Sequence, residues 1–67
     1  MAKIQLNGKK ISIKSNFSIF DLLKKYNLAK KKIAIEYNGL IISKTDYKKK
    51  YLKNDDKLEI VHFIGGG

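Results

Sequence analysis

Apolar and polar side chains alternate in two short runs near the N-terminus of the chain. The first run covers residues 3–6 and the second covers residues 10–14. A period of two is typical of strands that bury one face. Asn7 and Gly8 stand between the runs, and both residue types tolerate the positive φ angles of a two-residue hairpin turn. Residues 3–14 are therefore predicted to form a β-hairpin.

The spacing of apolar residues changes to that of a helix after residue 18. Four side chains recur at the period of one helix face, namely Ile19, Leu22, Leu23 and Tyr26. Ser18 followed three residues later by Asp21 is a variant of the capping box, with aspartate in place of the usual glutamate or glutamine. We therefore predict one helix that begins at Ile19 and ends at Asn27, a residue type that favours the left-handed conformation after a helix.

Alternation returns in the second half of the chain. Residues 33–43 contain two apolar runs separated by Asn38 and Gly39, which predicts a second β-hairpin. Thr45 and Asp46 are expected to cap a short helical turn after this hairpin.

The last strand is predicted over residues 57–63, after a turn at residues 54–56. One set of its side chains is expected to face the core, namely Leu58, Ile60 and His62. The other set is expected to face outward, namely Lys57, Glu59, Val61 and Phe63. One helix among about five strands can cover only one face of a sheet, which predicts an α+β domain with two layers. The sheet is mixed if the first and last strands pair in its centre.

Size and composition limit the classes of function. The chain has 67 residues, which is room for one domain. A domain of about 60 residues buries only about 60% of the surface of its unfolded chain, so a deep substrate pocket does not fit. Cysteine is absent, which excludes disulfides, thiolate metal sites and a cysteine nucleophile. These limits favour a carrier, a binding module or a subunit over an enzyme.

The charge is strongly basic and comes from lysine alone. The chain carries 15 lysines, no arginine and a net charge of +9. Lysines attract phosphate backbones, so a small nucleic-acid-binding domain is one alternative, and it would bind with a steep dependence on salt. Arginine is the residue that reads guanine edges and grips phosphate with two bonds. Its absence favours a solvated basic surface instead.

Catalytic and metal-binding groups are not recognisable in the sequence. His62 is the single histidine and is expected to have a structural role in its strand. Asp55 and Asp56 are adjacent, and neighbouring residues of a solvated turn do not normally aim at one point. We therefore expect no catalytic residue, no metal ligand and no bound cofactor.

The candidate functional segment is the run of Gly65, Gly66 and Gly67. A strip of glycine fits a channel too narrow for other residues, and the chain from Ile64 to Gly67 can extend about 13 Å beyond the sheet. A carboxylate at its end is a poor electrophile, so ATP and a separate enzyme would have to activate it. A frayed end or a cloning remnant is the alternative. The chain thus divides into a domain over residues 1–64 and a flexible tail over residues 65–67.

Four segments of the chain resemble, in order, the ThiS family of sulfur carriers. They are IQLNGK at residues 4–9, SIFDLL at 18–23, IAIEYNG at 33–39 and LEIVHFIGGG at 58–67. Each motif is short, but their ordered combination spans nearly the whole chain. The resemblance implies a ubiquitin-like β-grasp fold, in agreement with the predicted order of elements.

The resemblance also implies a reaction at the end of the chain. Gly67 is expected to be adenylated by a ThiF-type adenylyltransferase that uses ATP. Sulfur from a cysteine desulfurase system or another donor then converts the adenylate to a thiocarboxylate. This group is expected to deliver sulfur to a thiazole synthase of the ThiG type in thiamine biosynthesis. Gly66 and Gly67 match the invariant pair of the family, so no residues beyond them need to be removed.

The high positive charge departs from the family, whose carriers are often neutral or acidic. Partner recognition is therefore expected to rest on apolar contacts, and exposed apolar side chains often mark an interface. We expect Val61, Phe63 and Ile64 to dock on the partner while Gly65, Gly66 and Gly67 enter its active site. Packing of Phe63 against a neighbouring loop is the alternative.

Other carriers of the same fold remain possible from the sequence. The small subunit of molybdopterin synthase and the carriers of tRNA thiolation share the Gly-Gly chemistry and differ in the acceptor of sulfur. A ubiquitin-like modifier is another possibility, because an activated C-terminus can react with a lysine amine.

The polar N-terminus and the lack of an apolar run of about 20 residues predict a protein of the bacterial cytoplasm, or of the plastid stroma.

Overall fold

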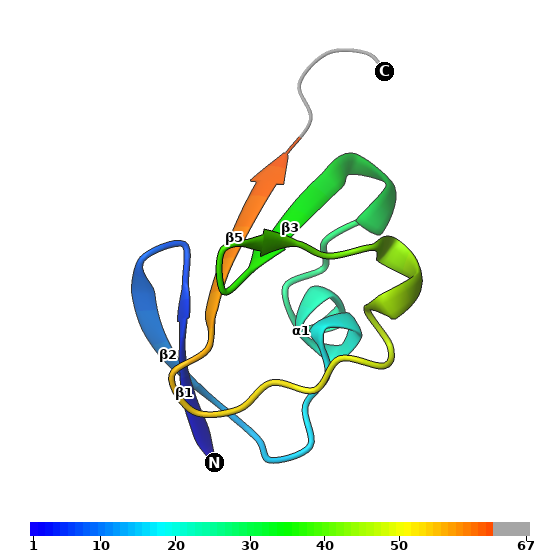
Figure 1. Cartoon of the computed structure of the whole chain (residues 1–67). Coiled ribbons are helices and arrows are strands. Elements are labelled where there is room, and N and C mark those ends of the chain that lie inside the picture. Colours follow the sequence, from blue (N-terminus) through cyan, green and yellow to red (C-terminus); the bar gives the residue numbers. More distant parts are fainter. Residues whose placement is uncertain (63–67) are drawn as a thin grey trace.

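The computed structural model describes residues 1–62, and for Lys30 its backbone alone. Five strands form one sheet: β1 (Ala2–Leu6), β2 (Lys9–Ile13), β3 (Ile33–Tyr37), β4 (Leu40–Ile41) and β5 (Lys57–His62). Three helical elements join them: α1 (Ile19–Lys25) and the 3-10 turns η1 (Lys30–Lys32) and η2 (Lys44–Asp46). Figure 1 shows this arrangement.

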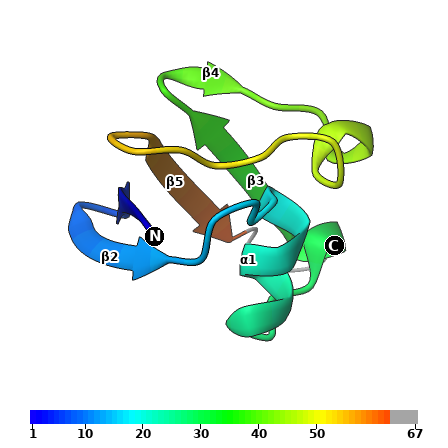
Figure 2. The same cartoon turned by 90° about the horizontal axis from the view of Figure 1, so that it is seen from below.

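The sheet has the strand order β2-β1-β5-β3-β4, so the first and last strands lie side by side in its centre. β5 runs parallel to β1 and antiparallel to β3, and the outer pairs are antiparallel. Helix α1 lies across one face of the sheet (Figure 2). The predicted α+β class and the mixed sheet are therefore confirmed.

Both predicted hairpins are present. Leu6 pairs with Lys9 in the first and Tyr37 with Leu40 in the second, so each connection is a two-residue turn. Asn7 and Asn38 both have φ of 50°, and the glycines that follow them also have positive φ angles. These are the left-handed angles that an Asn-Gly turn of type I′ requires.

Helix α1 begins at Ile19 as the sequence predicts, and its last residue is Lys25, two positions before the predicted end at Asn27. The Ser18 hydroxyl accepts a hydrogen bond from the Asp21 N–H, and the Asp21 carboxylate accepts one from the Ser18 N–H, both at 3.0 Å. These two bonds lower the pKa of Asp21, the backbone bond being the larger cause. After the helix, Asn27 has φ of 56°, and Leu28 N–H donates to the Leu23 carbonyl at 2.8 Å, which closes a Schellman motif.

The core lies between α1 and the inner face of the sheet. Its fully buried side chains are Ile4, Ile19, Leu22, Ile33, Ile35, Tyr47 and Leu58. Tyr47, directly after η2, closes the core beside the helix, where its backbone carbonyl accepts from the Phe20 N–H at 3.0 Å. Burial raises the pKa of the Tyr47 hydroxyl.

Two sequence-based predictions about the helical elements are wrong. Tyr26 was expected in the buried stripe but is 42% exposed, because α1 ends at Lys25 and Tyr26 already belongs to the cap. Thr45 and Asp46 lie inside η2 and do not cap it. The residue before η2 is Ser43, and its hydroxyl lies 3.0 Å from the Thr45 hydroxyl instead of capping the backbone.

His62 also departs from its predicted place in the core, since it is exposed. It follows Leu58 and Ile60 in the alternation of β5, but the β1 pairs reach only to Leu58. His62 therefore has a neighbouring strand on one side only, where it pairs with Ile33.

The turn at residues 54–56 is not uniformly solvated. Asp55 is exposed as expected, whereas Asp56 is 2% exposed. The Asp56 carboxylate accepts hydrogen bonds from the Tyr37 hydroxyl at 2.8 Å, the Lys53 N–H at 2.9 Å and the Asn38 amide at 3.1 Å. A buried carboxylate needs such partners, because burial without them is costly.

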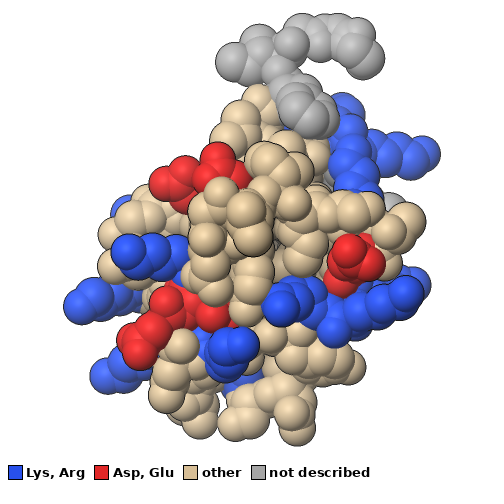
Figure 3. All heavy atoms as spheres, in the orientation of Figure 1, with Lys and Arg blue, Asp and Glu red and all other residues tan. Residues whose placement is uncertain are grey.

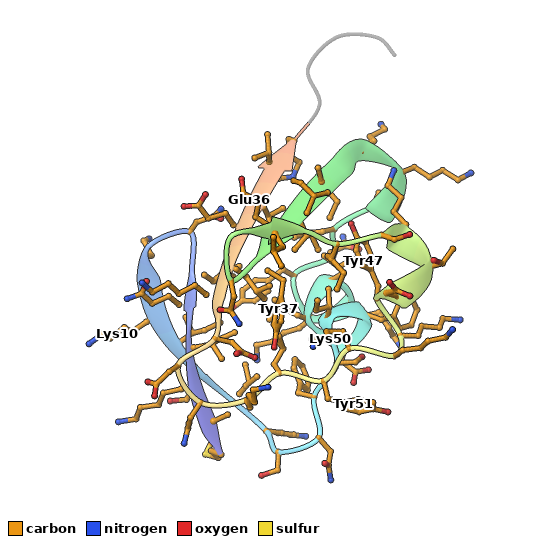
Figure 4. The ribbon with its side chains drawn as sticks, in the orientation of Figure 1. Lys10, Glu36, Tyr37, Tyr47, Lys50 and Tyr51 are labelled. Carbon is orange, nitrogen blue, oxygen red and sulfur yellow. The ribbon has the colours of Figure 1, made fainter. Side chains whose placement is uncertain are left out.

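Tyr37 is held neutral by this contact. Burial, the hydrogen bond to Asp56 and the negative charge of that carboxylate raise the pKa of Tyr37 from 10.0 to about 12. The Lys50 ammonium lies 4.6 Å from the centre of the Tyr37 ring, and Figure 4 shows the two side chains together. The tyrosine thus joins β3 to the segment that precedes β5.

The raised pKa predicts a loss of stability at alkaline pH. Between pH 10 and about 12 the tyrosine ionises in the unfolded chain and stays neutral in the folded one, so the free energy of unfolding falls as pH rises. Tyr37→Phe should give a shallower fall over this range, measured by urea denaturation at a series of pH values. The matched control Tyr51→Phe, at an exposed tyrosine, should keep the wild-type slope. A Tyr37→Phe slope equal to that of the wild type would contradict this role of the hydroxyl.

Candidate functional site

The candidate site is the end of β5, from which the predicted functional segment continues. Gly65, Gly66 and Gly67 lie outside the described residues, as do Phe63 and Ile64. The structure therefore shows how the protein holds the strand that leads to this segment.

The turn of the first hairpin holds β5 at Ile60, two residues before the end of the strand. The Asn7 carboxamide accepts a hydrogen bond from the Ile60 N–H at 2.7 Å and donates one to the Ile60 carbonyl at 3.4 Å. Its backbone N–H also donates to the Leu58 carbonyl at 2.9 Å. The pairing of β1 with β5 stops at Leu58. Beyond that point the Asn7 side chain takes the place of a strand as the hydrogen-bond partner of β5.

The turn of the second hairpin holds the other end of β5 in the same way. The Asn38 carboxamide accepts from the Lys57 N–H at 2.8 Å, and the Asn38 N–H donates to the Lys57 carbonyl at 2.8 Å. We call these two contacts the Asn7 clamp and the Asn38 clamp. Sequence reasoning identified both asparagines as turn residues only, because nothing local shows that a turn will lie against a strand 53 positions away.

The outer face of the sheet near this end carries one apolar pair, which is followed on the same face by the pair of Glu36 and Glu59. Val61 is 56% exposed, so its predicted outward orientation is confirmed. Its partner across the strands is the half-buried Ala34. Of the three residues predicted to dock on a partner, Val61 alone belongs to the described part of the chain.

A second exposed apolar surface lies at the edge strand β4, where Leu40 and Ile41 are 74% and 72% exposed. These side chains line a groove of about 480 Å³ between the second hairpin and η2, with Lys49 and Lys50 on its other side. This groove was not predicted. The signal that could have indicated it is the run of three consecutive apolar residues Leu40, Ile41 and Ile42, which does not alternate with polar residues.

The remaining candidate groups do not converge. Asp55 points to solvent and Asp56 is buried in its hydrogen bonds, so the pair shares no site. Among residues 1–62, histidine and acidic side chains form no group of three that could hold a metal ion. The same residues include no helix long and apolar enough to cross a membrane.

The comparisons with known proteins agree on one family. The sequence model of the ThiS family matches residues 3–67. The sulfur carrier protein ThiS of Bacillus subtilis is 45% identical over 65 residues, which cover 96% of this chain and 98% of that protein.

A longer relative matches the chain over part of its length. A thiazole synthase of Magnetococcus marinus is 38% identical over 65 residues, and this chain spans 20% of that protein. The crystal structure of a thiamine biosynthesis protein (ThiS) from Geobacter metallireducens matches with a TM-score of 0.82 and covers 97% of this chain and 99% of that one. Its sequence identity is 24%, so this match supports the ubiquitin-like fold.

The Asn7 clamp gives a prediction about the end of β5. Asn7→Gly keeps the positive φ of the turn but removes the two carboxamide bonds, so it should lower the free energy of unfolding by about 1–2 kcal/mol. The Ile60 amide should exchange its hydrogen faster than in the wild type, as measured by NMR.

Asn16→Gly is the matched control, since Asn16 also has positive φ but is exposed and makes no such bond in the described structure. Equal effects of the two substitutions on Ile60 exchange would show that the Asn7 clamp does not hold the strand.

Proposed function

The chain belongs to the ThiS family, and we propose that it carries sulfur as a thiocarboxylate on the terminal carboxyl group of Gly67, for thiazole formation in thiamine biosynthesis. The observation that carries this proposal is the 45% identity to a named ThiS sulfur carrier over 98% of that protein's length. The matched region includes all three C-terminal glycines in the family model.

The proposed chemistry takes place on partner enzymes and proceeds in three steps. A carboxylate oxygen of Gly67 attacks the α-phosphorus of ATP, and pyrophosphate leaves. A persulfide of the donor then attacks the carbonyl carbon of this mixed anhydride, and AMP leaves with one of the original oxygens. A thiol of the partner enzymes cleaves the S–S bond of the resulting acyl disulfide, which leaves the thiocarboxylate on Gly67 and a disulfide on the partner. ATP and the catalytic groups for these steps belong to a ThiF-type adenylyltransferase, and the sulfur comes from a donor such as a cysteine desulfurase system.

The fold supports this role because it anchors the strand from which the reacting segment continues. β5 is paired with β3 from Leu58 to His62 and is held at Ile60 by the Asn7 clamp, so the strand is fixed up to its last described residue. Five residues follow His62, and in extended form they reach about 17 Å. Such a tail can enter a partner's active site while the domain stays outside.

A thiazole synthase is the proposed acceptor of the sulfur. In the Magnetococcus marinus relative, a segment 38% identical to this chain forms part of a protein named thiazole synthase. Because the two parts share one polypeptide in that relative, we expect this chain to bind a separate thiazole synthase. We place the carrier in the compartment of these enzymes, the bacterial cytoplasm or the plastid stroma.

We further propose that Val61, Phe63 and Ile64 form the apolar contact with these partners. The exposure of Val61 supports this contact, because its side chain costs little to bury on association and is not needed for the core.

The thiocarboxylate is tested by intact-mass spectrometry after incubation with ATP, a ThiF-type enzyme and a sulfur donor. The expected result is a mass gain equal to the exchange of one oxygen for one sulfur. A variant that lacks Gly66 and Gly67 should show no gain, since the reactive carboxylate would no longer reach the active site. Absence of both adenylate and thiocarboxylate in the wild type, with several enzymes of this class, would reject the proposed function.

The apolar contact is tested by Val61→Lys. This change should raise the KM for the carrier in the adenylation reaction by about 10-fold, because burial of a charge at the contact is unfavourable. Leu40→Lys is the control, since Leu40 is still more exposed and lies at the edge strand β4. The docking proposal fails if the two variants are adenylated alike, provided that both unfold at the wild-type temperature.

A further inference from the structure

Two lysines lie where β5 ends. His62, the last residue of β5, pairs with Ile33, the first residue of β3. Lys31 and Lys32 immediately precede Ile33 in η1, and both are exposed. Paired residues of neighbouring strands are about 5 Å apart, so these lysines stand next to the base of the tail. We call Lys31 and Lys32 the tail-base pair.

The charge around this pair is not balanced locally. Residues 22–35 contain five lysines, at 24, 25, 30, 31 and 32, and no acidic residue. The acidic residue of β5 is Glu59, three positions before His62, which corresponds to about 10 Å along the strand. Glu36 pairs with Glu59 and is equally far from this end, so Lys31 and Lys32 are closer to the end of β5 than either glutamate. Figure 3 shows lysine side chains projecting on one side of the upper part of the molecule and acidic side chains on the other.

The tail-base pair has no structural task that the fold reveals. Lys24 and Lys25 lie in the last turn of α1, where cations offset the negative end of the helix dipole, and Lys24 also lies 5.6 Å from the Phe20 ring centre. By contrast, no hydrogen bond, ion pair or ring contact joins the side chain of Lys31 or Lys32 to another described residue, although the Lys32 backbone N–H donates to the Ala29 carbonyl at 3.0 Å. Two adjacent exposed cations repel each other, so their presence at this position calls for an external partner.

We propose that Lys31 and Lys32 contact an acidic rim around the channel of the adenylyltransferase into which the tail inserts. This inference rests on the proposed function and adds the chemistry by which the partner is recognised. When the tail is inserted, its base lies at the channel mouth, so the two ammonium groups lie within one Debye length, about 8 Å, of the surrounding surface. Charges at that distance steer association and raise its rate.

An acidic protein surface is a better binding partner for Lys31 and Lys32 than a second copy of the chain or a nucleic acid. A second copy of the chain also carries +9 and is repelled. A nucleic acid would engage lysines over the whole surface, including a separate hollow of about 280 Å³ whose charged lining residues are Lys3, Lys10, Lys57 and Asp55. That hollow lies at the other end of β5, about 17 Å from His62 by the rise of the strand.

The distance between the two ends provides a matched control. Lys9 and Lys10 are adjacent and exposed in β2, and through β1 they stand level with Leu58 and Lys57. The variants Lys31→Glu/Lys32→Glu and Lys9→Glu/Lys10→Glu change the net charge equally. Both are compared with the wild type for adenylation by a ThiF-type enzyme, in salt from about 0.1 M to about 1 M, over which the Debye length falls from about 10 Å to about 3 Å.

The tail-base variant should lose about 10-fold or more in kcat/KM at low salt with kcat nearly unchanged, and the loss should shrink at high salt. The conservative variant Lys31→Arg/Lys32→Arg should retain wild-type activity. The control variant should stay within about threefold of the wild type.

Three outcomes would overturn the inference. Equal losses in the two glutamate variants would assign the effect to total charge. An unchanged tail-base variant would remove the contact, and a loss confined to kcat would indicate a chemical role instead. Inactive wild-type protein, by contrast, would reject the proposed function itself, so the two failures are distinguishable. Titration with single-stranded RNA in the same salt series identifies a nucleic-acid occupant, which would also contradict the proposal.

Discussion

The parallel pairing of β1 with β5 brings the first and last strands of the sheet together in its centre. It requires Leu6 to pair with Leu58, and the loop closure that joins such distant residues is costly in entropy. The cost is offset by the burial of both strands under α1 and by the backbone bonds that β5 makes on each side. If this pairing were lost, β5 would become an edge strand, and the segment that follows it would have no fixed origin.

The two asparagine clamps show how a short domain completes its central strand with few residues. β1 is five residues long and β5 is six, and they overlap over only two pairs. The Asn7 carboxamide replaces a missing peptide group at Ile60, and the Asn38 clamp extends the ladder of β3 at Lys57. In each case the side chain that allows the left-handed turn also supplies the bonds, so one residue type satisfies two requirements.

Much of the fold could be predicted from the sequence, because its signals are local. The two Asn-Gly turns, the capping box of Ser18 and the alternation of β5 each involve residues within a few positions of one another. The errors came from tertiary context. Whether His62 is buried depends on where the pairing with β1 stops, and no local pattern contains that information. Asp56 appeared as a solvated turn residue because two of its three partners, Asn38 and Tyr37, are 18 and 19 positions away.

The central position of β5 also determines how the molecule resists a pulling force. In the proposed function, a partner that draws the tail into its active site pulls along the axis of β5, which pairs with β3 on one side and, at Lys57 and Leu58, with β1 on the other. Hydrogen bonds of a sheet lie across the strands, so this force loads the bonds of β5 in shear, and many must break together. A tail attached to the edge strand β4 would instead be peeled away one bond at a time. The topology therefore makes the carrier mechanically strong in the direction in which its function would load it.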